Sequence, residues 1–283
     1  MSDRSFRNIG YQIMWTRLMA VVEEQAKSLI RTAFSSTVSE AGDLSAGIFD
    51  VDGRMVAQAV TGTPGHVNSM AEAVKHFLHF FPVSSMSDGD HFITNDPWLS
   101  SGHLHDVTVV TPAFREDDVI GLFACCCHQV DIGGLGQGPD GRSVFEEGFA
   151  IPIMYLARQG SINIDLIDLV RANVRLPDQV EGDIMSYMAS NEAGVRHLNQ
   201  MLDEFPDIRL EALSDFILER SRSAVIEQIN KLPTGIYRNS ITADGYDKPV
   251  TLEAAVKIAD ETITVDYTGS APASSYGINL VMN

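Results

Sequence analysis

The stretch VTVVTPAFREDDVIGLFACCCH, residues 107–128, decides the fold because it holds two apolar segments separated by charged residues. Val107–Pro112 is rich in β-branched residues, which favour a pleated strand. Asp117–His128 predicts a second strand, and its dense apolar residues indicate burial on both faces. These two segments place a β-sheet at the centre of the chain.

The residues before this stretch predict two helices and three further strands. Ile13–Phe34 carries apolar residues at helical spacing, and Val67–Phe81 predicts a second helix that stops at a proline. Val51-Asp52-Gly53 is a typical hairpin turn between two short apolar runs. The strands predicted for this part are Ala46–Asp50, Arg54–Ala59 and Gly89–Thr94.

The residues after the stretch predict a glycine-rich loop, a helical segment and a β-meander. The loop at residues 133–141 is not followed by Gly-Lys-Ser/Thr, so we interpret it as the rim of a site and not as a phosphate loop. Asp178–Asn199 and Ile208–Asn230 are the best helices, and their apolar residues favour core packing over a cofactor site. Those core residues are Met185, Met188, Leu198, Met201 and Leu202. The meander strands are Gly235–Ala243, Val250–Ala259 and Thr262–Tyr267.

The order of these elements predicts an α+β protein with a mixed β core, a helical middle segment and a C-terminal β-meander. We expect a metal-binding α/β core at residues 1–164, a helical segment at residues 165–232 and a meander at residues 233–283. The sequence ends inside an apolar stretch without a charged tail, which predicts a meander that is cut short and a last domain that is incomplete.

The charge of the chain excludes one large class of partners. Its 283 residues carry 38 Asp and Glu against 20 Lys and Arg, a formal net charge of −18, which repels nucleic-acid phosphates. No apolar run approaches the roughly 18–20 residues of a membrane span, and the first ten residues lack a signal-peptide pattern. The three consecutive cysteines at residues 125–127 cannot build a disulfide framework. We therefore expect a cytoplasmic protein that binds neither nucleic acid nor membrane.

The densest chemical signal combines two imidazoles and a carboxylate at the ends of neighbouring strands. His103 and Asp106 precede the first central strand, and His128 ends the second. Imidazole and carboxylate ligands suit zinc, manganese or iron(II). His103 and Asp106 can converge only if this strand begins irregularly, which Ser100-Ser101-Gly102 permits. The spacing alone leaves a second interpretation open, in which loop histidines cluster without function.

Other candidate residues are weaker when each is taken alone. His66 is a possible ligand or substrate contact, although a cap of the following helix is the simpler interpretation. Asp43 would ordinarily be a turn carboxylate. The three cysteines lie on a strand that we expect to be buried, and buried thiols are usually inert. Neither a Gly-x-Ser-x-Gly elbow nor a Cys-x-x-Cys pair occurs.

A family resemblance is carried by several short stretches that follow one another in a fixed order along the chain. The stretches are Glu40–Ser45, Gly65–Met70, Gly89–Pro97, Gly102–Val109, His128–Gly134, Phe145–Gly148, Asn173–Pro177, Gly182-Asp183 and Asp266–Ser270. Together they resemble the B subunit of the hydantoinase/oxoprolinase family, which includes N-methylhydantoinase, 5-oxoprolinase, caprolactamase and the related ketone carboxylase subunits. The resemblance covers about Trp15 to the last residue.

The resemblance implies a divalent metal, zinc or manganese or else iron, in this subunit. Carried over by motif, its ligands are Asp43, His103, Asp106 and His128. Two histidines and two carboxylates leave a position for water or substrate, as catalytic sites require. From their place beside the ligands in sequence, we predict that Asp131 and His66 orient a ligand or transfer a proton. Asn95 and Asp96 are expected to shape their loop.

The resemblance also implies a reaction divided between subunits. A partner A subunit, similar to sugar-kinase-type ATPases, binds ATP and phosphorylates the substrate. In amide-opening members, metal-bound water then attacks the activated amide, and this is the leading interpretation for this chain. Alternatives are the metal-containing subunit of an ATP-dependent ketone carboxylase, and a truncated assembly partner without catalysis.

Three departures from the family pattern are expected to matter. Gln129 stands where the family often has a second histidine, and His105, a possible competing ligand, stands where proline is common. Family B subunits are also longer than this chain, which predicts that the C-terminal part is missing or is supplied by another chain.

Overall fold

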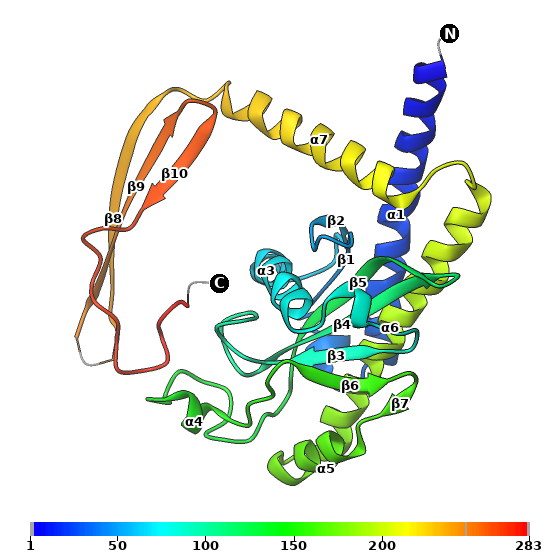
Figure 1. Cartoon of the computed structure of the whole chain (residues 1–283). Coiled ribbons are helices and arrows are strands. Elements are labelled where there is room, and N and C mark those ends of the chain that lie inside the picture. Colours follow the sequence, from blue (N-terminus) through cyan, green and yellow to red (C-terminus); the bar gives the residue numbers. More distant parts are fainter. Residues whose placement is uncertain (1–2, 247, 282–283) are drawn as a thin grey trace.

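A computed structural model describes residues 3–246 and 248–281 of the chain and places one large sheet at its centre (Figure 1). The strand order is β2-β1-β5-β4-β3-β6-β7, and every pairing among the described residues is antiparallel. The expected α+β class is confirmed, with the refinement that the β core is antiparallel and not a mixture of orientations. The strands are β1 (Leu44–Phe49), β2 (Met55–Gln58), β3 (His91–Thr94), β4 (Asp106–Arg115), β5 (Asp118–His128), β6 (Met154–Arg158) and β7 (Ser161–Ile162).

The hairpin of β4 and β5 forms the middle of the sheet, as the opening stretch predicts. Its register pairs Asp106 with His128 at one end and Arg115 with Asp118 at the other. Because side chains alternate along a strand, Cys125 and Cys127 pack into one apolar cluster while Cys126 packs into the other. The predicted burial of both faces is therefore confirmed. All three thiols are free, and burial raises the pKa of Cys126 and Cys127, which keeps both protonated and unreactive.

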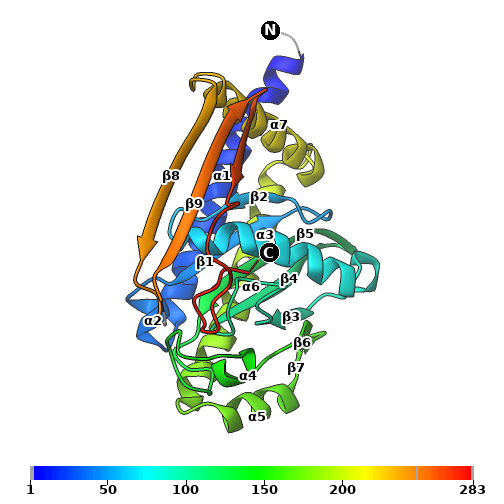
Figure 2. The same ribbon diagram turned by 90° about the vertical axis from the view of Figure 1, so that its left-hand side faces the viewer.

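Two long helices cover one face of the sheet and a shorter one covers the other (Figures 1 and 2). On the first face lie α1 (Asp3–Thr32) and α6 (Pro177–Glu204), which contribute Leu18, Val22 and Leu198 to a shared core. On the second face lies α3 (Pro64–Phe80), which packs Met70, Val74 and Phe77 against the strands. The five apolar residues predicted as core in and near α6 all belong to or pack against the first core.

Close contact between α6 and the sheet depends on a glycine. A Cβ atom at Gly194 would lie 2.5 Å from the ring of Phe123 on β5, so only glycine lets the helix approach this far. The first helix extends further than its apolar pattern predicts, since it begins at Asp3 and not near Ile13. Its early turns carry more polar residues, which the periodicity of core residues does not detect.

After α6 the chain leaves the main sheet, and its final segment folds back toward the glycine-rich loop (Figure 1). Helix α7 (Leu210–Ile229) leads to a three-stranded antiparallel sheet of β8 (Gly235–Ala243), β9 (Val250–Ala259) and β10 (Thr262–Asp266). These strands match the predicted meander within one residue. The segment after β10 folds back, and the Gly277 backbone N–H donates to the Pro139 carbonyl (3.0 Å) in the glycine-rich loop.

Several short elements complete the fold without a clear signal in the sequence. They are α2 (Ser36–Ser39), the 3-10 helix η1 (Val83–Ser85) and α4 (Val144–Glu147), together with strand β6 and the edge strand β7. Helix α5 (Ile164–Asn173) lies at the start of the segment that the sequence predicts to be helical. Among the helices of the described residues, none has both the length and the apolar character that a membrane span requires.

Candidate metal centre

The sheet brings Asp106 and His128 together because they are cross-strand partners at the end of the central hairpin. Their side chains meet with 3.0 Å between Asp106 Oδ1 and His128 Nδ1. Asp43 directly precedes β1, the neighbour of β5, and its carbonyl accepts a hydrogen bond from the His128 backbone N–H (3.1 Å). Asp43 Oδ2 lies 4.0 Å from His128 Nδ1. Three strand ends therefore supply three side chains to one point.

His103 reaches the same point from an irregular turn before β4. Gly102 has a φ of +97°, and the Asp106 backbone N–H donates to the His103 carbonyl (3.3 Å), so the chain turns before the strand begins. This turn leaves 2.9 Å between His103 Nε2 and Asp106 Oδ2. The irregular strand start that the sequence required is confirmed.

His66 lies in the first turn of α3, the helix on the second face of the sheet, and its ring reaches the same carboxylates. Its Nε2 is 3.0 Å from Asp106 Oδ2 and 3.8 Å from Asp43 Oδ1. The helix is preceded by Thr63, whose hydroxyl donates to Asp43 Oδ1 (2.6 Å). The simpler interpretation of His66 as a helix cap is therefore wrong, because the ring is buried between two carboxylates.

Asp106 is the electrostatic centre of this cluster, which consists of Asp43, His66, His103, Asp106 and His128. Its side chain is 2% exposed, and burial alone would raise its pKa. Hydrogen bonds from His103, His128 and His66 outweigh burial and hold the pKa of Asp106 far below its usual range. Burial likewise opposes the charged form of His103, but the Asp106 carboxylate raises the pKa of that ring above its ordinary value. A fully charged carboxylate thus lies among imidazole nitrogens.

The donor chemistry of the cluster fits a divalent metal. The ligand atoms of His103, Asp106 and His128 all lie within 4.8 Å of one another, and nitrogen with carboxylate oxygen suits zinc, manganese or iron. His66, Asp106 and Cys126 form a second group of this kind, in which the fully buried Cys126 thiol contacts the Ser101 hydroxyl (3.3 Å). A third group consists of His103, His105 and Glu147. The first group, with Asp43 beside it, offers the most complete set.

The cluster opens into a cavity of about 680 Å³. His103, His105 and His128 line it, and the glycine-rich loop and residues 273–277 and 279–281 form much of its wall. The predicted position of this loop at the rim of a site agrees with this lining.

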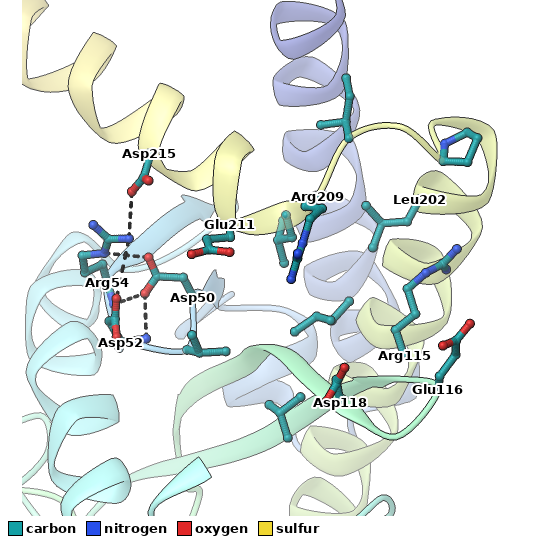
Figure 3. A pocket seen from close by; sticks show the side chains of 16 residues that line it. Asp50, Asp52, Arg54, Arg115, Glu116, Asp118, Leu202, Arg209, Glu211 and Asp215 are labelled. Carbon is teal, nitrogen blue, oxygen red and sulfur yellow. Dashed lines mark hydrogen bonds and ion pairs between the residues drawn. The ribbon is translucent and has the colours of Figure 1, made fainter. Parts of the chain in front are cut away.

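A second cavity, of about 710 Å³, lies at the other end of the β4–β5 hairpin (Figure 3). Its lining includes Arg54, which pairs with Asp50 and Asp215, and no histidine among the described residues. The ten-residue strand β4 separates the two cavities by roughly 30 Å, at about 3.3 Å per residue. None of the predicted site residues lines this second cavity.

Comparison with known proteins identifies the family. Residues 7–283 match the Hydantoinase B/oxoprolinase family. The chain belongs to this family. The putative D-/L-hydantoinase B subunit of a Pseudomonas species is 26% identical over 93% of this chain and 47% of its own length. The chain spans about half the length of the first curated relatives that it matches.

Two solved structures of related fold extend this comparison. The ATP-dependent caprolactamase of Pseudomonas jessenii has a TM-score of 0.82 and 26% identity, covering 91% of this chain and 45% of that one. A nucleotide-free acetone carboxylase has a TM-score of 0.87 at 20% identity, covering 98% of this chain and 39% of that one. The second likeness is one of fold alone.

The two departures from the family pattern within the site have different surroundings. The Gln129 side chain is buried and donates to the Tyr187 hydroxyl on α6 (2.7 Å), so it points to the helical layer. The His105 ring stacks on His128 with 5.1 Å between centroids, and its Nδ1 lies 4.0 Å from Glu147 Oε1. Of the two residues, only His105 places a further possible metal-ligating nitrogen beside the cluster.

Asp131 lies near His128 in sequence, but its described contacts go elsewhere. Its Oδ1 accepts from Arg175 Nη1 (2.7 Å) and from the Gly133 backbone N–H (3.0 Å), and its Oδ2 accepts from the Arg175 backbone N–H. These bonds hold the pKa of Asp131 below its ordinary value despite burial. No hydrogen bond from Asp131 to His128 occurs among the described contacts. Asp131 therefore joins the glycine-rich loop to the turn before α6.

Three residues of the site carried no chemical role in the sequence interpretation. Ser101 donates to Asp106 Oδ2 (2.8 Å), and Thr63 holds Asp43. Glu147 accepts from the Leu104 backbone N–H (2.8 Å) and has a lowered pKa because that bond and the His105 and His103 rings outweigh burial. The Phe145–Gly148 motif contains Glu147, yet nothing in its spacing connects it to His103.

Proposed function

We propose that this chain is the metal-bearing part of a B-type subunit of an ATP-dependent cyclic amide hydrolase, which opens hydantoin, 5-oxoproline or lactam rings. The observation that carries the proposal is the convergence of three imidazoles and the Asp43 carboxylate around the buried Asp106. Membership of the Hydantoinase B/oxoprolinase family and the names of relatives such as the β subunit of caprolactamase support the reaction class.

In this proposal Asp43, His103, Asp106 and His128 hold the divalent metal, zinc or manganese or else iron. When bound, the metal supplies a Lewis acid that makes water a competent nucleophile near neutral pH. His66 holds its Nε2 proton toward Asp106 Oδ2 and so fixes the orientation of that carboxylate. Asp131 acts as a positioning residue, because its bonds to Arg175 and Gly133 set the loop that forms the cavity rim.

The other half of the reaction belongs, in this proposal, to a partner. We infer an A-type subunit in the cytoplasm that binds ATP and phosphorylates the substrate. Two relatives that are named as subunits of larger enzymes support a partner: the hydantoinase B subunit and the β subunit of caprolactamase. Ketone carboxylation and a role in assembly without catalysis are the alternatives that the assay must separate.

The decisive test is elemental analysis of the purified chain beside His103→Ala and His128→Ala. We expect about one equivalent of divalent metal per chain in the wild type and little in either variant, because each loses an imidazole donor. Folded wild-type protein without metal would contradict the proposal and favour the assembly role. Metal-loaded protein is then assayed with an A-type partner, ATP and either a hydantoin or a small ketone with bicarbonate. ATP turnover with the ketone alone would favour the carboxylase.

Asp131→Asn tests the positioning role. We expect unchanged metal content, because the described contacts of Asp131 go to Arg175 and Gly133 and not to a proposed ligand. Loss of the ion pair with Arg175 should loosen the loop, lowering turnover with little effect on affinity for the metal. Elemental analysis measures the metal content, and a chelator competition measures the affinity for the metal. A metal-free Asp131→Asn protein that stays folded would show that Asp131 supports the ligands directly.

A further inference from the structure

A second set of metal donors lies beside the proposed centre. It consists of His103, His105 and Glu147, whose ligand atoms all lie within 4.8 Å of one another. Glu147 Oε1 lies 3.9 Å from His103 Nδ1 and 4.0 Å from His105 Nδ1. Two imidazoles and one glutamate are a ligand set that catalytic zinc sites use. Of these three residues, only His103 belongs to the ligands of the proposed function.

The Glu147 carboxylate is held in place by the segment that carries both histidines. The backbone N–H of Leu104, which lies between them in the sequence, donates to Glu147 Oε1 (2.8 Å). Hydrogen bonds of this kind orient ligands in metal sites, and a carboxylate that accepts one still has lone pairs for a cation. The turn before β4 and the helix α4 therefore present three donors to one point.

The His105 ring is buried without the hydrogen bonds that usually hold a structural histidine. Its side chain is 4% exposed, and its Nε2 has no hydrogen-bond partner among the described residues. The 4.0 Å between its Nδ1 and Glu147 Oε1 is longer than a hydrogen bond. Two donors that bind one zinc ion at about 2.0–2.2 Å each lie up to about 4 Å apart. The spacing therefore suits a cation between the ring and the carboxylate.

The three donors also border space that a cation can enter. His103, His105 and Glu147 all line the cavity of about 680 Å³. Three protein ligands leave one position of a tetrahedral ion to water or to a substrate oxygen. The second set therefore has the form of an open site and not of a closed structural one.

His103 connects the two sets of donors because its ring nitrogens face different carboxylates. Its Nε2 lies 2.9 Å from Asp106 Oδ2, and its Nδ1 lies 3.9 Å from Glu147 Oε1. A cation at each nitrogen replaces the one N–H proton of the neutral ring, which leaves to solvent. The resulting imidazolate and the carboxylates of Asp43, Asp106 and Glu147 balance the charge of two divalent cations.

We propose that His105, Glu147 and Nδ1 of His103 bind a second divalent cation beside the metal of the proposed function. The inference rests on the proposed function, because His103 serves both sites. The second cation binds more weakly than the first, since it has three protein donors and shares one of them. Its open position faces the cavity, where it binds and orients an oxygen of the substrate.

The test adds zinc chloride to the purified chain that already carries one equivalent of metal, and calorimetry counts the zinc that binds. We expect one further equivalent in the wild type. Glu147→Gln keeps an acceptor for the Leu104 N–H but removes the carboxylate, so it should lose the second equivalent and retain the first. His105→Leu should have the same effect, because it removes an imidazole donor.

Glu146→Gln is the matched control and should still bind the second equivalent. Glu146 is the neighbouring carboxylate on α4, accepts from the Arg142 backbone N–H (2.8 Å) and is not among the described residues that line the cavity. The control is needed because a chain with a net charge of −18 also attracts cations to its surface. Thermal unfolding of each variant checks that a loss of zinc does not come from loss of folding.

The outcomes separate this inference from the proposed function. A wild-type chain that takes up no zinc beyond the first equivalent overturns the inference and leaves the proposed function standing. A second equivalent that Glu147→Gln retains, or that Glu146→Gln loses, also overturns it. A purified chain without any metal contradicts the proposed function before zinc is added, and the inference fails with it. Anomalous diffraction from zinc-soaked wild-type crystals locates the second ion without a variant, and a peak away from Glu147 would contradict the assignment.

Discussion

Asp106→Asn is expected to lower the affinity for the metal by more than roughly 100-fold, which is the largest functional effect that we predict. The carboxylate is 2% exposed and lies 2.9–3.0 Å from nitrogens of His66, His103 and His128. Asparagine keeps the shape but removes the charge and one acceptor, so the imidazoles lose the anion that they surround. Metal content and competition with a chelating dye measure the effect.

Two further variants sharpen this experiment. Asp118→Asn, at the opposite end of the same hairpin, is the control and should bind metal as the wild type does. Ser101→Ala removes only the hydroxyl that donates to Asp106 Oδ2 and should lower the affinity by about 10-fold. Wild-type metal binding by Asp106→Asn would contradict the central place of this carboxylate.

Asp183→Ala is expected to lower the free energy of unfolding by about 3 kcal/mol, which is the largest effect on stability that we predict. Asp183 is fully buried on α6, and its Oδ1 accepts from the backbone N–H groups of Phe34 (2.7 Å) and Ser35 (3.1 Å). Alanine leaves both groups without this acceptor. The Phe34 ring also packs directly on Gly182, where a Cβ would lie 2.3 Å from it. Loss of the Asp183 bonds would therefore also disturb this close packing between α6 and the residues that follow α1.

Chemical denaturation measures this loss against a matched control. Asp178→Ala removes a carboxylate from the first turn of the same helix, but that side chain is 87% exposed and pairs with Arg171 at the surface. Surface ion pairs of this kind contribute at most about 1 kcal/mol. Equal unfolding midpoints for Asp183→Ala and Asp178→Ala would show that Asp183 does not support the junction.

The sequence predicts the sheet well where one physical signal dominates. Dense apolar residues identify β5, and β-branched residues identify β4, because burial selects such side chains. Strands β6 and β7 were not predicted, since both are short and lack clear alternation of apolar and polar residues, and β7 lies at the edge of the sheet. The division of the chain at residues 164 and 232 stays a prediction, although α6 packs against the sheet and shares its core.

The candidate site is predictable only as far as local motifs reach. Asp106 and His128 can be paired from the strands that carry them, because the hairpin register brings their ends together. Asp43 was predicted as a ligand only through the family resemblance. Its position in the sequence gives no hint of the hydrogen bond between its carbonyl and the His128 backbone N–H. The contact of Asp131 with Arg175 joins residues 44 positions apart, so proximity in sequence wrongly suggested a contact with His128. Such long-range pairs follow from how helices pack on the sheet, which no short motif encodes.

The location of the cluster at three adjacent strand ends also determines when it can form. Asp43 reaches His128 only after β1 has paired with β5, and long connections delay such pairing because loop closure costs conformational entropy. The unfolded chain therefore offers no preformed set of donors. A cation that binds these side chains selects the folded state and adds its binding free energy to folding. The metal would therefore stabilise the arrangement of β1, β4 and β5 in addition to taking part in the reaction.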